Sequence, residues 1–82
     1  MKIIKISAIW CSSCIIMKSR FNEVIKEKEI DVESLDYDMD DIEKYNVGDI
    51  LPVFIKIENG KETSRLVGEH SKKEIDEFVG EV

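Results

Sequence analysis

The chain contains few of the residues that build rigid frameworks or flexible linkers. Its 82 residues include one proline, four glycines and two cysteines. The low proline and glycine content excludes collagen-like and low-complexity chains. Two cysteines three positions apart are a poor structural staple, because so short a disulfide loop stabilises little. The length corresponds to one domain, which we expect to span residues 1–82.

Long apolar runs and an excess of basic residues are also missing. No apolar run approaches the roughly 18 residues that cross a bilayer, and Lys2 and Lys5 interrupt the apolar start, which argues against a secretory signal. Eighteen acidic residues against 12 basic ones give a formal net charge of −6. This charge disfavours nucleic acids and anionic membranes as partners. We therefore expect a cytoplasmic monomer that binds neither nucleic acid nor membrane.

The apolar pattern predicts four strands and three helices. Isoleucine-rich or alternating segments favour strands, whereas apolar residues every three or four positions favour helices. The expected strands are residues 2–8, 31–37, 53–57 and 62–67. The expected helices are residues 12–28, residues 41–46 and a last helix that begins after Ser71.

Local signals mark two of the boundaries. Asn59-Gly60 indicates a tight hairpin between the last two strands, because both residues tolerate positive φ. Ser71 with Glu74 forms the pattern of a capping box. The apolar stripe of the last helix consists of Ile75, Phe78, Val79 and Val82. The element order βαβαββα predicts an α/β fold in which helices cover both faces of a four-stranded mixed sheet.

Cys11 and Cys14 stand where the first expected strand gives way to the first expected helix. Unpaired N–H groups and the helix dipole stabilise a thiolate there, and such settings lower a cysteine pKa from about 8.5 to about 3.5–7.5. Positions i and i+3 are neighbours on one helical turn. We therefore expect Cys11 to be the more exposed, attacking thiol and Cys14 to resolve the mixed disulfide. The pair would be its own redox cofactor.

The same two thiolates could instead hold a metal ion or an iron–sulfur cluster. Zinc needs two further ligands, and His70 is the only histidine. A metal-binding module would therefore need ligands from a second chain, so we expect no metal site within this one. The acidic stretch over residues 31–49 lacks the glycine and the glutamate that a calcium loop requires at fixed positions.

Three segments resemble parts of the thioredoxin family. Tryptophan before C-x-x-C is similar to the family's active site, the second segment to its cis-proline segment, and the third to its valine–glycine near the active site. The segments are Trp10-Cys11-Ser12-Ser13-Cys14, Ile50-Leu51-Pro52-Val53-Phe54 and Leu66-Val67-Gly68. They occur in the family's order, and the resemblance covers nearly the whole chain. The chain lacks the extra N-terminal strand and helix of full thioredoxins and is closer in length to glutaredoxins.

The resemblance implies a minimal thioredoxin fold and a thiol–disulfide oxidoreductase that reduces protein disulfides. A flavin-dependent reductase or a small thiol would then re-reduce it. Pro52 would be cis and lie against the sulfurs, and the backbone of Leu51 would pair with an extended substrate segment. Trp10, Leu51 and Gly68 would form an apolar collar around Cys11. The substrate-binding residues implied in this way are Trp10, Ser12, Ser13, Leu51, Pro52 and Gly68.

The chain departs from the family pattern at three places. The dipeptide between the cysteines is Ser-Ser, not the Gly-Pro of thioredoxins or the Pro-Tyr of many glutaredoxins, which leaves the reduction potential open. Lys5 occupies the position of the thioredoxins' buried aspartate. Its charge would favour a nearby thiolate, although we expect it to reach water on a thinly covered face.

The third departure concerns the residues with which glutaredoxins hold glutathione. Ile50-Leu51 and Val67-Gly68-Glu69 stand in their places. This substitution weakens glutathione binding as the main function, and a glutathione-coupled, glutaredoxin-like protein remains an alternative.

Overall fold

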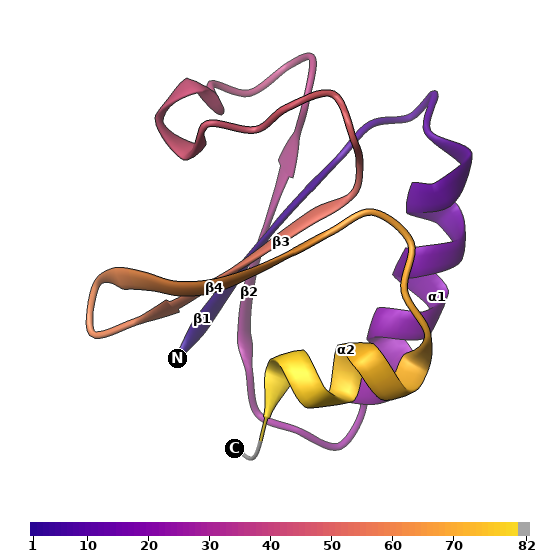
Figure 1. Ribbon diagram of the computed structural model, residues 1–82, viewed down its shortest axis with the longest axis vertical. Helices are drawn as coiled ribbons and strands as arrows, with labels where there is room; N and C mark the ends of the chain where they lie inside the picture. The colour runs from indigo at the N-terminus through magenta and orange to yellow at the C-terminus, as the bar shows by residue number, and fades with distance from the viewer. Residues whose placement is uncertain (81–82) are drawn as a thin grey trace.

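Four strands form one mixed sheet in the computed structural model, which describes residues 1–80 (Figure 1). The elements are β1 (Lys2–Ser7), α1 (Ser12–Ile25), β2 (Asp31–Asp36), the 3₁₀ turn η1 (Glu43–Tyr45), β3 (Val53–Glu58), β4 (Lys61–Val67) and α2 (Lys72–Val79). The strand order is β2-β1-β3-β4. β1 runs parallel to β2 and antiparallel to β3, and β3 pairs antiparallel with β4. The predicted α/β class and four-stranded mixed sheet are confirmed.

Alternation along β1 sends neighbouring side chains to opposite faces of the sheet, as the period of a strand requires. Ile3 joins a cluster with Phe21 of α1 and Phe54 of β3, whose rings stack with centroids 4.7 Å apart. Ile4 and Ile6 belong to the cluster on the other face, which also contains both cysteines. Buried side chains of α1 therefore pack in the clusters on both faces of the sheet, which fixes the helix relative to the strands.

Both α-helices lie on the same face of the sheet (Figure 1). The helix predicted over residues 41–46 is only the single 3₁₀ turn η1, and this turn and its flanking loop cover the opposite face. Ile42, Tyr45 and Val47 are half-buried there. These three apolar side chains are too few for the stripe of an α-helix, and Asn46, with φ 52°, ends the turn in the left-handed region.

One of the two α-helices differs from its predicted extent at its C-terminal end. α1 ends at Ile25 instead of residue 28, because the N–H of Lys28 donates to the carbonyl of Ile25 in a closing turn (2.9 Å). α2 begins after Ser71 with the predicted capping box. Val82, assigned to the stripe of this helix, lies outside the described residues.

No helix within residues 1–80 is both long and apolar enough to span a membrane.

Candidate active site

Cys11 is the N-cap of α1 and Cys14 lies in its first turn. Cys11 has extended backbone angles (φ −94°, ψ 109°), and its Sγ accepts a hydrogen bond from the N–H of Cys14 at 3.2 Å. Its own N–H donates to the carbonyl of Ala8 at 3.2 Å, which fixes the turn between β1 and α1. Both cysteines are free thiols. A hydrogen bond from a backbone N–H at a helix start favours negative sulfur at Cys11.

The two cysteine residues differ in their electrostatic surroundings and hardly in their exposure. Cys11 is 8% exposed and Cys14 is 7% exposed, so the structure shows no clear difference in accessibility of the kind predicted from the sequence. Burial raises the pKa of Cys14 to about 11, the contact with Cys11 adds to this rise, and the charge of Lys5 opposes it. Cys14 is therefore a protonated thiol at neutral pH.

Pro52 lies beside the cysteines at the start of β3. The Leu51–Pro52 peptide bond is cis, as the sequence led us to expect. Pro52 is buried and lines the same pocket as Cys14. Its carbonyl accepts a hydrogen bond from the N–H of Gly68 at 2.9 Å. This contact joins the end of β4 to the proline, and so the three segments that resemble the family meet around the sulfurs.

The positive φ of Gly68 explains why glycine stands there. With φ +83°, the residue lies in the left-handed region, where a side chain is strained. A Cβ at this position would also meet the side chain of Ile50 at 3.4 Å. Gly68 is buried, so it shapes the surface near the sulfurs through its backbone.

Leu51, predicted to form part of an apolar collar around Cys11, packs in the core with Cys11, and its exposed neighbour is Ile50. The side chain of Leu51 is 6% exposed and packs in the core cluster with both cysteines, whereas Ile50 is 60% exposed. Leu51 begins the buried run that continues into β3, so it points inward. We use "apolar rim" for four exposed apolar residues that lie in the three segments or directly before one of them. They are Ile9, Trp10, Ile50 and Val67.

Trp10 is exposed but held in place. Its side chain is 60% exposed, and its Nε1–H donates to Asp38 Oδ2 at 2.6 Å. Its ring meets Tyr37 edge-on, with centroids 6.0 Å apart. Sequence reasoning missed both partners, because they are distant in the chain and carry no local signal. Of the two serines between the cysteines, Ser12 is exposed and Ser13 is half-buried.

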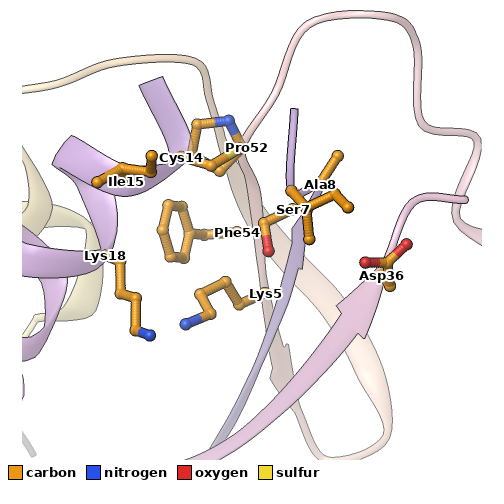
Figure 2. A pocket seen from close by; sticks show the side chains of 10 residues that line it. Lys5, Ser7, Ala8, Cys14, Ile15, Lys18, Asp36, Pro52 and Phe54 are labelled. Atoms are coloured by element: carbon orange, nitrogen blue, oxygen red, sulfur yellow. The ribbon is translucent and has the colours of Figure 1, made fainter. Parts of the chain in front are cut away.

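A pocket of about 210 Å³ opens next to Cys14, between α1 and β1 (Figure 2). Lys5 and Lys18 line it together with Cys14, Pro52 and Phe54. Lys5 is half-buried, and burial and the nearby charge of Lys18 lower its pKa. The sequence predicted a Lys5 that reaches water on a thinly covered face, and the structure places it at this open pocket. Lys18 stands four positions after Cys14, a helical spacing that could have revealed it.

The described residues offer no group of three or more His, Cys, Asp or Glu side chains that could hold a metal ion. The arrangement instead provides two thiols in one helical turn, a proline peptide beside them and an apolar rim outside. Such an arrangement can form and break disulfide bonds by thiolate attack.

Comparison with known proteins identifies the family. The family model described as Thioredoxin matches residues 1–81. Thioredoxin from Fasciola hepatica is 26% identical, with a TM-score of 0.84 over 95% of this chain and 76% of that one. The reduced thioredoxin pre-protein of Schistosoma mansoni is 25% identical, with a TM-score of 0.82 over 95% of this chain and 74% of that one. Trxlp from Edwardsiella tarda is 19% identical and shares the fold, with a TM-score of 0.89 over 98% of this chain and 82% of that one. The chain belongs to the thioredoxin family, as a thiol–disulfide oxidoreductase of thioredoxin fold.

Proposed function

We propose that this protein reduces disulfide bonds in protein substrates, with Cys11 as the attacking thiol and Cys14 as the resolving thiol. One observation carries the proposal: the Sγ of Cys11 caps α1 and accepts the N–H of Cys14, so the two cysteines share one turn. Membership of the thioredoxin family supports oxidoreductase chemistry, and the position of the two thiols supports these roles.

The reaction proceeds by two thiolate attacks. The Cys11 thiolate attacks one sulfur of the substrate disulfide, the substrate S–S bond breaks, and the first substrate sulfur leaves as a thiolate and takes up a proton. Cys14 then loses its proton and attacks Cys11 Sγ in the mixed disulfide. The second substrate sulfur leaves and is protonated, and the protein is left with a Cys11–Cys14 disulfide. The substrate has gained the two electrons that the dithiol lost.

The apolar rim supports a protein as the substrate. Ile9 is 90% exposed, and Trp10 and Ile50 are each 60% exposed. Exposed tryptophan is typical of residues that anchor partners. Because Asp38 and Tyr37 hold Trp10 in one orientation, docking loses little side-chain freedom. In the proposed complex, the backbone of Leu51 pairs with an extended substrate segment, and Ser12, Ser13, Pro52 and Gly68 form the floor beneath it.

The oxidised protein needs an electron donor. We propose a flavin-dependent reductase or a small thiol in this role, and the cytoplasm as the compartment, since its thiol pools are reducing. The redox-active disulfide itself serves as the cofactor. No observation on the described residues favours glutathione over another donor.

Reduction of insulin by the protein, with dithiothreitol as donor, tests the proposal. We expect the wild-type chain to accelerate the reaction and Cys11→Ser to abolish the acceleration. In a separate reaction without dithiothreitol, pre-reduced Cys14→Ser should accumulate a mixed disulfide with the substrate, visible by mass spectrometry, because no second thiol remains in the protein to resolve it. Full activity in the Cys11→Ser variant would contradict the mechanism. Efficient turnover with glutathione and glutathione reductase would identify the donor as glutathione.

A further inference from the structure

Cys14 must lose a proton before it can attack, yet its surroundings oppose this. The side chain is 7% exposed, and burial raises its pKa to about 11. At neutral pH only a very small fraction of Cys14 is then a thiolate. The resolving step therefore depends on groups that stabilise a negative sulfur at this position.

The pocket beside Cys14 contains two such groups. Lys5 reaches it from β1, and Lys18 reaches it from α1, one helical turn beyond Cys14. Figure 2 shows the two lysine side chains extending toward one another from opposite sides of this space. Among residues 1–80, neither lysine forms an ion pair within 4.0 Å. Their charges are therefore not neutralised by a directly paired carboxylate.

The other groups around the pocket oppose these two charges only in part. Asp36, at the end of β2, is the one carboxylate that lines it, and Ser7 adds a hydroxyl. β3 contributes the aromatic side chain of Phe54, which does not titrate. A pocket of about 210 Å³ has room for several water molecules. Water there could take the proton that Cys14 releases.

We propose that Lys5, supported by Lys18, promotes the resolving step by stabilising the Cys14 thiolate across this pocket. This rests on the proposed function. The Cys14 proton passes to pocket water and from there to solvent, while the sulfur electron pair forms the bond to Cys11 Sγ. The bond between Cys11 and the substrate breaks, and the substrate thiolate leaves. Lys5 touches neither sulfur and gains or loses no proton in this step. It acts through its charge.

The reactivity of Cys14 at neutral pH, where Lys5 is charged, tests this role directly. In a Cys11→Ser background, Cys14 is the only thiol, and its rate of alkylation by uncharged iodoacetamide at about pH 7 reports how much of it is thiolate. We expect Lys5→Met to slow this alkylation about twofold to fourfold, because a nearby opposite charge is lost. Lys5→Arg should leave the alkylation rate nearly unchanged. Lys61→Met, at the exposed start of β4, removes the same charge far from the pocket and is the matched control.

The rate of resolution gives a second readout in the chain with both cysteines. A mixed disulfide with uncharged 2-mercaptoethanol on Cys11 is followed by rapid quenching and alkylation, so that the probe has no charge for the lysines to attract. A rise in the Cys14 pKa lowers the fraction of thiolate and so slows the attack. A more basic sulfur is also a better nucleophile, so a pKa rise of one unit slows the rate only about threefold to fourfold. We expect Lys5→Met to slow the resolving step about twofold to fourfold. Lys18→Met should slow it less, and Lys61→Met should leave it unchanged.

Two results would overturn this role for Lys5. One is an unchanged rate of Cys14 alkylation at neutral pH in Lys5→Met relative to Lys61→Met. The other is an equal slowing of the resolving step in Lys5→Arg and Lys5→Met, which would mean that the shape of the side chain matters and not its charge. If Lys5→Met fails to fold, Lys5→Gln and Lys18→Met take its place. The alkylation measurement needs no disulfide substrate, so its outcome is independent of whether the protein reduces protein disulfides.

Discussion

The two cysteines have nearly equal exposure, but their nearest dipoles and charges differ. Cys11 caps the helix and accepts a backbone N–H, whereas Cys14 is desolvated and its pKa is raised. The proposed roles of attacking and resolving thiol rest on this difference. The sequence prediction of these roles rested partly on a difference in exposure that the structure does not show.

The raised pKa of Cys14 makes the stability of the reduced protein depend on pH. A thiol whose pKa rises from 9.0 to about 11 on folding is protonated in the native state while the unfolded chain ionises. The native state then binds more protons, so stability is retained below about pH 9 and falls as the pH rises toward 11. A pKa difference of two units corresponds to about 2–3 kcal/mol in the free energy of unfolding. Urea unfolding of the reduced protein at about pH 8 and about pH 10.5 measures most of this loss.

Cys14→Ser is the matched control for that measurement. It removes the titrating thiol and keeps the lysines and tyrosines that also titrate at high pH. The wild-type chain should lose about 1–2 kcal/mol more than the variant over this range. Equal losses would show that the native and unfolded states hold the Cys14 proton with the same affinity.

Which site residues could be predicted depends on how local their signal is. Cys11, Cys14, Pro52 and Gly68 carry signals within a few positions, and the structure brings them together. The bond from Trp10 to Asp38 crosses 28 residues, and no pattern along the chain marks it. Distant polar contacts of this kind depend on how the 37–51 loop folds back, which composition alone does not determine.

At the scale of elements, the strands with a clear alternation of apolar residues were predicted correctly, whereas the end of α1 was not. Strand alternation placed all four strands within one residue of their observed ends. The pattern of α1 continues to Lys28, whose side chain pairs with Asp76 at 3.7 Å. Its position at helical spacing predicted Lys28 as part of the helix, although α1 ends at Ile25. No glycine or proline marks that end, so only the need to turn into β2 determines it.

The capping box of α2 should make a measurable contribution to stability. Ser71 Oγ accepts the N–H of Glu74 at 3.2 Å, and the Glu74 carboxylate accepts the N–H of Ser71 at 3.0 Å. We expect Ser71→Ala to lower the free energy of unfolding by about 1 kcal/mol, because it leaves an N–H at the helix start without its partner. Urea denaturation at constant m-value is the measurement.

Ser71→Asp provides the matched control for this prediction. Aspartate also caps helix starts, and its charge suits the positive end of the helix dipole. It should therefore keep most of the stability that alanine loses. If alanine and aspartate destabilise the protein equally, the contribution of position 71 comes from something other than its side-chain cap.

At the scale of the whole molecule, the net charge is −6, and several of the acidic residues lie close to the apolar rim. Asp38 is bonded to Trp10, Asp49 precedes Ile50, and Glu69 follows Gly68. Arg20 offsets only one of these carboxylates, through its 3.5 Å contact with Glu69. A protein substrate of the proposed reaction would therefore approach an apolar surface bordered by negative charge. We expect this border to favour substrates with basic residues near the reacting disulfide.

Two peptides with one disulfide each, flanked by lysines in one and by glutamates in the other, make this preference measurable. At low salt we expect kcat/KM to be about threefold to tenfold higher for the lysine peptide, because the field steers its approach. At about 0.5 M salt, screening over a few ångströms should bring the ratio close to one. Asp49→Asn removes one exposed carboxylate beside the rim and should lower the ratio at low salt without changing the rate for an uncharged peptide. A ratio near one at low salt, or one that salt leaves unchanged, would mean that the apolar contacts alone select the substrate.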